Sequence, residues 1–99
     1  MIDIVVLDNN INHSYACVFK KNRTEYYANV FKAANGKIIC DIYRATSVPE
    51  VMGRYVLEEL LYRNDSEDNF FSPTTLARHI ENYFNEEVNW IYYNYDEEE

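Results

Sequence analysis

Residues 24–43, TEYYANVFKAANGKIICDIY, decide the fold of this chain because they read as two strands joined by a tight turn. Asn35-Gly36, between two runs of apolar and β-branched residues, is a strong hairpin signal, since a type I′ turn needs positive φ at both central residues. A two-residue loop would place Phe31 opposite Cys40. The expected core face of this hairpin consists of Tyr27, Phe31, Ala33, Ile38, Cys40 and Ile42.

Two further strand-like runs precede the hairpin. Ile2–Leu7 and 14–20 are rich in β-branched and aromatic residues, which favour strands. If the second, third and fourth strands form a meander, Cys17 and Cys40 lie on strands about 10 Å apart, which is too far for a disulfide. We therefore expect two buried free thiols.

From Ser47 onward the apolar residues recur at helical spacing. Residues 47–50, Ser-Val-Pro-Glu, match a capping box and predict a helix that continues to about Arg63. Its apolar stripe would consist of Met52, Val56, Leu57, Leu60 and Leu61. Ser72-Pro73 predicts the start of a second helix. The apolar positions of that helix are Leu76, Ala77, Ile80, Tyr83, Phe84 and Val88. The run 90–95 then predicts a final strand.

The 99 residues are expected to form one compact α+β domain, 1–99. Its fold would be an antiparallel sheet, in the order ββββααβ, with two helices packed on one face. The chain divides into a β half (1–46), an acidic helical half (47–88), and a final strand with an acidic tail (89–99).

The charge of the chain limits its partners. Nine Lys and Arg oppose seventeen Asp and Glu, a net charge of −8, with +2 on residues 1–46 and −10 on residues 47–99. This charge opposes direct binding to nucleic acid or to an anionic membrane. The sequence has no apolar run of about 20 residues and no basic-then-apolar leader. We therefore expect a cytoplasmic protein, in the host cytoplasm if the chain is phage-encoded.

No motif indicates catalysis, a cofactor or a metal. Cys17 or Cys40 with His13 or His79 contains the elements of a thiol–imidazole pair, but no glycine-rich turn supplies an oxyanion hole. The spacing of these four residues matches no metal-binding motif. We expect a protein that is not an enzyme, with no catalytic residue, cofactor or metal ligand.

Residues 57–80 have a passing likeness to a helix-turn-helix DNA reader, because a capped second helix follows a first helix and a loop. The second of these helices carries a single basic residue, Arg78, in the half of the chain with a charge of −10. Phosphate contacts would have to come from elsewhere, so a DNA-binding regulator is the least favoured interpretation.

Acidic and aromatic residues alternate in the second half. The candidate partner-binding residues are Asp65, Glu67, Asp68, Glu81, Glu86, Glu87, Tyr92, Tyr93, Tyr95, Asp96 and Glu97. Carboxylates interleaved with tyrosines suit a partner surface rich in Lys and Arg, such as a nucleic-acid-binding cleft. The same composition also serves solubility, so the pattern has two interpretations.

These observations predict a small stoichiometric inhibitor, monomer or homodimer, that blocks the DNA- or RNA-binding surface of a larger basic protein. In length, acidity and α+β build the chain is similar to phage anti-defence proteins (anti-CRISPR and antirestriction) and to nuclease immunity proteins. Reversal of Glu86 and Glu87 to Lys should then abolish inhibition and leave the fold intact. The alternative is a non-inhibitory interaction module or accessory subunit that pairs through a sheet edge, at Ile2–Leu7 or 90–95.

Overall fold

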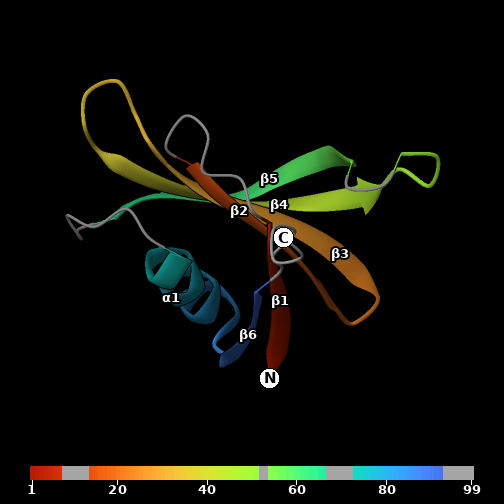
Figure 1. Cartoon of the computed structure of the whole chain (residues 1–99). Coiled ribbons are helices and arrows are strands. Elements are labelled where there is room, and N and C mark those ends of the chain that lie inside the picture. Colours follow the sequence, from red (N-terminus) through yellow and green to blue (C-terminus); the bar gives the residue numbers. More distant parts are fainter. Residues whose placement is uncertain (8–13, 52–53, 67–72, 93–99) are drawn as a thin grey trace, which may run out of the picture.

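The computed structural model describes residues 1–7, 14–51, 54–66 and 73–92 of the chain. Within these residues it has β1 (Ile2–Leu7), β2 (Ser14–Lys21), β3 (Thr24–Lys32), β4 (Ile38–Ser47), β5 (Tyr55–Ser66), α1 (Pro73–Phe84) and β6 (Val88–Tyr92). The six strands form one sheet in the order β5-β4-β3-β2-β1-β6, and α1 lies against one side of it (Figure 1).

The topology combines an antiparallel meander with one parallel strand. β1 to β5 follow one another across the sheet, each antiparallel to the last. The chain then returns through α1, and β6 pairs with β1 in parallel. The sheet edges are therefore β5 and β6, whereas β1, which the sequence suggested as an edge, lies in the interior.

The prediction of two helices on an antiparallel sheet in the order ββββααβ is wrong, because the segment expected to form the first helix belongs to β4 and β5. Ser47 is the last residue of β4, and the connection to β5 is closed by a hydrogen bond from the N–H of Val48 to the carbonyl oxygen of Arg54 (2.9 Å). Ser47 does not cap a helix. Its own N–H donates to Oε1 of Glu25 on β3 (2.8 Å).

Two bulges in β5 explain why its sequence looks helical. The pairing with β4 shifts by one residue at two places, and the extra residues on β5 are Glu58 and Leu61. Leu57 and Leu60 therefore lie on the same face of the sheet, because their partners on β4 are two residues apart. A spacing of three is typical of a helix, whereas a regular strand repeats every two residues.

The turn between β3 and β4 is one residue longer than the predicted two-residue loop. Gly36 has a φ of 89°, and its N–H donates to the carbonyl oxygen of Ala33 (2.9 Å). This is the geometry of a three-residue loop with glycine in the left-handed region. The register moves by one residue, so that Val30, in place of Phe31, pairs with Cys40.

This shift exchanges the two faces of β3. Ala28 and Val30 are buried in the core, whereas Tyr27 and Phe31 lie on the opposite face and are half-buried. Side chains alternate along a strand, so a slip of one residue moves every side chain to the other face. The β4 members of the predicted core face, Ile38, Cys40 and Ile42, are buried as expected.

α1 confirms the second predicted helix as far as Phe84, whereas Val88, which was assigned to that helix, is the first residue of β6. The helix covers the core face of the sheet. It begins at Pro73, and Leu76, Ala77 and Ile80, which are spaced along one side of the helix, are buried. At its C-terminal end, the ring of Phe84 contacts two rings of the sheet. The ring centroids lie 5.6 Å from Phe19 and 5.1 Å from Tyr26.

The prediction of two buried free thiols is confirmed. Cys17 on β2 and Cys40 on β4 lie on either side of β3, and both are fully buried and unpaired with each other.

The stability of two leucine variants tests the corrected role of β5. Leu57→Ser should change the free energy of unfolding by less than about 0.5 kcal/mol, because the side chain is 44% exposed. Leu76→Ala should lower it by about 2–5 kcal/mol, because this leucine is fully buried under the sheet. Urea titration followed by circular dichroism measures both. A loss at Leu57 as large as that at Leu76 would contradict the exposed strand and favour a packed helix.

Candidate functional site

The predicted acidic-aromatic residues fall into three groups. Glu67, Asp68, Tyr93, Tyr95, Asp96 and Glu97 lie outside the described residues. Tyr92 is the last residue of β6. Asp65 lies on β5, whereas Glu81, Glu86 and Glu87 lie at the end of α1 and the connection to β6.

Asp65 is separated from the other described acids. It pairs with Lys37 (3.3 Å), next to the β3–β4 turn, and both side chains are exposed. Its strand is one edge of the sheet and β6 is the other, and six strands at about 4.8 Å spacing place the two edges roughly 24 Å apart. The described acids of the predicted surface thus form two separate groups.

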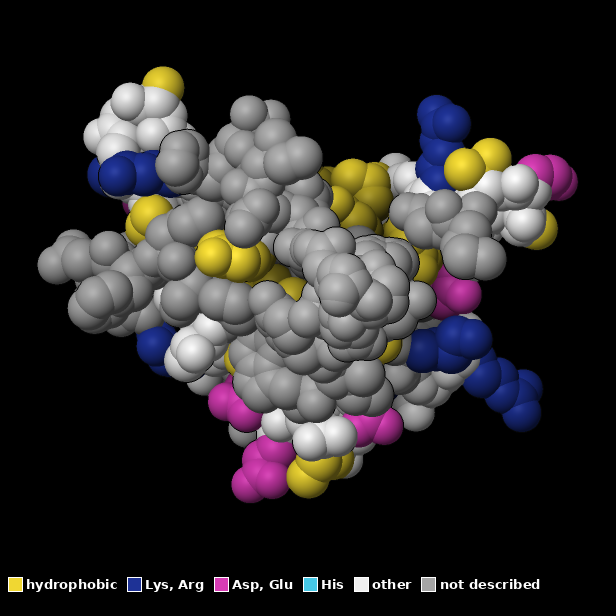
Figure 2. All heavy atoms as spheres, in the orientation of Figure 1, with side chains coloured by type: hydrophobic (Ala, Val, Ile, Leu, Met, Phe, Trp, Pro, Cys, Tyr) yellow, Lys and Arg dark blue, Asp and Glu magenta, His cyan; other side chains and the backbone are white. Residues whose placement is uncertain are grey.

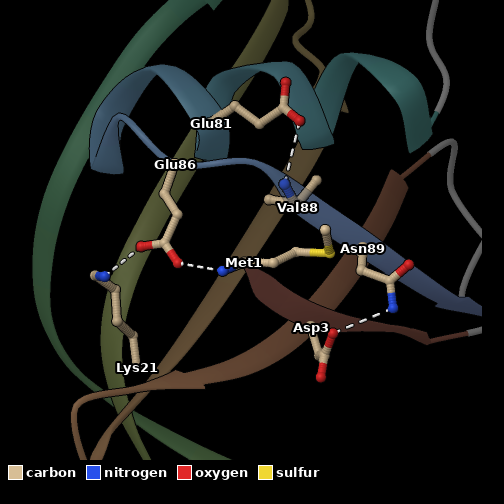
Figure 3. A network of polar contacts seen from close by, with 7 residues as sticks. All are labelled: Met1, Asp3, Lys21, Glu81, Glu86, Val88 and Asn89. Carbon is tan, nitrogen blue, oxygen red and sulfur yellow. Dashed lines mark hydrogen bonds and ion pairs between the residues drawn. The ribbon is translucent and has the colours of Figure 1, made fainter.

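Glu86 forms a junction between the end of α1 and the first strands (Figure 3). One carboxylate oxygen lies 2.8 Å from the N-terminal amine of Met1, and the other contacts Nζ of Lys21 on β2. The hydrogen bonds from Lys21 and from the N-terminal amine lower the pKa of Glu86 from its ordinary value of 4.5 to about 2. This carboxylate joins three parts of the fold.

Glu81 also has a local structural role, and Glu87 does not share it. Oε2 of Glu81 accepts the N–H of Val88 at the start of β6 (3.2 Å). The N–H of Glu86 donates to the carbonyl oxygen of Glu81 (3.3 Å), and Asn85 has a φ of 55°, which together form the left-handed helix ending known as a Schellman motif. Of the three, Glu87 alone is exposed, and the other two are half-buried.

The expectation that reversing Glu86 and Glu87 leaves the fold intact therefore needs revision. A lysine at position 86 would put a third cation between the N-terminal amine and Lys21. Glu87 remains the position where reversal changes the surface charge without disturbing a described contact.

The feature that the sequence did not reveal is an exposed apolar patch on the β4–β5 hairpin. Six large hydrophobic side chains are exposed in the described part of the chain, and four of them lie within residues 51–60. These four are Val51 (45% exposed), Val56 (51%), Leu57 (44%) and Leu60 (44%), and we call them the β5 patch. Figure 2 shows hydrophobic side chains at the outer end of this hairpin, beside basic and acidic ones.

The sequence contained a signal for this patch. Tyr55-Val56 opens β5 with two strand-forming residues, but the helical spacing of the leucines that follow masked it. The same leucines were assigned to a buried helix stripe, and the two bulges place them on an edge strand.

Arg63 anchors β5 to β4 beyond the patch. Its Nε and Nη2 donate to the two carboxylate oxygens of Asp41 at 2.8 and 2.7 Å, and the Tyr43 hydroxyl donates to Asp41 at 3.2 Å. Asp41 is 1% exposed, and these donors satisfy its buried carboxylate oxygens. These bonds raise the pKa of Arg63 above its ordinary value. One half of β5 is thus tied to β4 by a charged pair, and the other half carries the exposed patch.

Three of the residues considered for catalysis, Cys17, Cys40 and His79, are buried. Burial raises the pKa of Cys40 to about 12 and that of Cys17 further, which disfavours the reactive thiolate of both. His79 is 8% exposed, and its Nδ1 lies 2.7 Å from the hydroxyl of Tyr62. His13 lies outside the described residues.

The described residues also lack two further kinds of feature. They contain no group of three or more His, Cys, Asp and Glu side chains arranged to hold a metal ion. Their single helix is too short and too polar to cross a lipid bilayer. Comparison of the chain with protein-family models, with curated proteins and with solved structures gave no match.

The Glu86 junction predicts a pH dependence of stability. The pKa of Glu86 is lower in the folded chain than in the unfolded chain, so its contribution is present above about pH 4.5 and is lost as the pH falls toward about 2. Glu86→Gln should therefore lower the stability at pH 7 and flatten its decline between pH 5 and about 2. Urea titrations at several pH values measure this. Glu87→Gln is the control, and an equal effect of both variants would contradict the junction.

Proposed function

We propose that this chain is a protein-interaction module that binds its partner through the free edge of β5 and the β5 patch. The observation that carries the proposal is that four of the six exposed large hydrophobic side chains of the described residues lie within ten residues, three on the edge strand β5 and Val51 in the connection before it. Soluble proteins rarely expose contiguous apolar surface without a use for it, and such patches mark interaction sites.

The edge position adds backbone groups to the side chains of the patch. A strand at the edge of a sheet has N–H and C=O groups on one side that an extended segment of a partner can pair with. The bulges at Glu58 and Leu61 interrupt the regular ladder, so only short regular stretches of β5 suit such pairing. Most of the binding energy would then come from Leu57 and Leu60, which share one face of the sheet, with the backbone setting the orientation of the partner.

The charges beside the patch define the chemistry of the partner. Glu50 and Glu58 are exposed next to it, Glu59 pairs with Arg44 at 3.4 Å, and Arg54 is exposed. Residues 48–60 therefore contain three acids and one base, a net charge of −2. An extended partner segment with apolar residues and flanking Lys or Arg fits this surface, and the overall charge of −8 would speed its association.

A narrower form of this function is the inhibition of a nucleic-acid-handling protein. It is supported by the charge of −10 on residues 47–99, which include β5. A partner with a basic DNA- or RNA-binding cleft would combine the flanking cations and the apolar contacts in one surface. Displacement of the chain from its partner by DNA or RNA distinguishes this form from an interaction module that leaves the cleft free.

The β5 patch is tested by comparing two variants of the tagged chain in affinity capture from a bacterial lysate. The double variant Leu57→Ser/Leu60→Ser should weaken capture of a specific partner at least about tenfold, because buried apolar anchors dominate interface energies. Tyr83→Ser is the control, since Tyr83 is another exposed large side chain (40%) but lies on α1. Thermal unfolding of each variant confirms that the fold is retained.

Three outcomes of this capture are informative. A partner lost in the double variant and kept in Tyr83→Ser supports the β5 patch, and its displacement by DNA or RNA supports the inhibitor. Concentration-dependent self-association in light scattering, abolished by the double variant, would make the partner a second copy. A partner retained equally by both variants would contradict binding through β5.

A further inference from the structure

A second surface, which is polar and basic where the β5 patch is apolar, lies where the β2–β3 turn meets the end of β4. A hollow of about 420 Å³ opens there. It is lined by Lys20, Arg23, Thr24, Glu25, Arg44, Ala45, Thr46 and Ser47. Three of these residues are basic and one is acidic, so the hollow carries a local charge of +2 in a chain whose net charge is −8.

Glu25, the single acid of the lining, is already occupied. Its Oε1 accepts the N–H of Ser47 (2.8 Å) and its Oε2 lies 3.4 Å from the Ser47 hydroxyl. Nζ of Lys20 lies 3.9 Å away, at the outer limit of an ion pair. This carboxylate holds the end of β4 to β3 and neutralises the cations of the hollow only in part.

The two arginines remain available to a ligand. Arg44 pairs with Glu59 at 3.4 Å between two exposed side chains, and such pairs contribute little and are readily exchanged. Arg23 is exposed and has no ion-pair partner among the residues that the structure describes. Guanidinium groups bind oxyanions through two parallel hydrogen bonds, and the hydroxyl-bearing residues Thr24 and Thr46 also line the hollow.

The backbone at Arg23 is strained. Asn22 and Arg23 form the two-residue turn between β2 and β3, with φ values of 53° and 71°. The second position of such a turn favours glycine, because a side chain is disfavoured in the left-handed region. Strained residues gather at functional sites, where the position of the side chain matters more than local stability. Here the residue in this conformation is an arginine that lines the hollow.

We propose that this hollow binds a phosphate dianion, either free or as a phosphomonoester. Two guanidinium groups, an ammonium group and several hydroxyls suit a tetrahedral oxyanion with two charges. The net charge of −8 repels a long polyanion such as a nucleic acid, but a single phosphate group meets mainly the local positive charge. The hollow adjoins the β5 patch, because Ala45 and Thr46 of its lining pair with Leu57 and Val56. Phosphate binding rests on Arg23 and Arg44 rather than on the apolar side chains, so its test is separate from that of partner binding.

Two-dimensional NMR titration of the labelled chain with inorganic phosphate, at constant ionic strength set with sodium chloride, tests the site. Saturable shifts should be confined to the amides of residues 20–25 and 44–47. Arg23→Gly should weaken phosphate binding about tenfold, since it removes a charged bidentate donor. The same change should raise the midpoint of thermal unfolding by about 4 °C, because it relieves the strained turn.

The opposite signs of these two effects make Arg23→Gly informative, since weaker binding cannot then be ascribed to unfolding. Arg54→Gln is the control, as it removes an exposed arginine outside the hollow and should leave phosphate affinity within about twofold. Phenyl phosphate titrated in parallel distinguishes the sources, because tighter binding than inorganic phosphate indicates a phosphorylated molecule and equal binding indicates the free anion.

Several results would overturn the proposal. They are the absence of saturable shifts, an unchanged affinity in Arg23→Gly, and an equal loss in Arg54→Gln. Tighter binding of a single-stranded oligonucleotide than of phosphate, with an affinity that grows with its length, would also overturn it and indicate a nucleic-acid surface instead.

Discussion

The packing of α1 against the middle of the sheet is the interaction on which the rest of this structure depends. The helix has 12 residues and is therefore about 18 Å long, and its backbone lies closest to β2, β3, β4 and β6. Leu76 and Ile80 are buried against β2, β3 and β4, which lie in the centre. Val56, at the outer end of the β4–β5 hairpin, extends beyond this layer, whereas Leu57 and Leu60 lie on the face of the sheet that α1 does not cover, and all three side chains stay exposed.

The β4–β5 hairpin is held together in part by the ion pair between Asp41 on β4 and Arg63 on β5. The buried carboxylate with its bidentate Arg63 ties β5 to β4 on the face that α1 does not cover. Removal of one member of such a pair leaves a buried charge without a partner, which is far more costly than loss of an exposed pair. The edge strand is therefore held to β4 on this face by a charged pair, and on the other face the hydroxyl of Tyr62 lies 2.7 Å from Nδ1 of His79 on α1.

Local patterns in the sequence predicted most of the strands, the second helix and the two buried thiols, because each depends on residues close together in the chain. The prediction of a first helix was wrong because two bulges in β5 give Leu57 and Leu60 a helical spacing. Nothing in the sequence marks Glu58 as an extra residue. The prediction of the buried face of β3 was wrong because Asn35-Gly36 occurs in loops of two or three residues. A difference of one residue places Val30, in place of Phe31, in the core.

The candidate site was harder to predict because its members are joined by tertiary contacts. Lys21 and Glu86 are 65 positions apart, and only the folded sheet brings them together, which turns an apparent surface acid into a structural one. The opposite error occurred at Leu57 and Leu60, where apparent core residues are on the surface. Charge and hydrophobicity in the sequence therefore indicated which residue types the surface would have, but not which residues would be free to bind.

Two features of this chain break local rules without an evident structural gain. The β5 patch exposes large apolar side chains on an edge strand, and Arg23 occupies a turn position that favours glycine. Glu81 and Glu86, in contrast, each satisfy groups at the helix end or the first strands. Natural sequences are locally consistent in most places, and their exceptions concentrate where function has been placed above stability. This contrast favours β5 and the hollow at Arg23, rather than the acidic end of α1, as the binding surfaces that we propose.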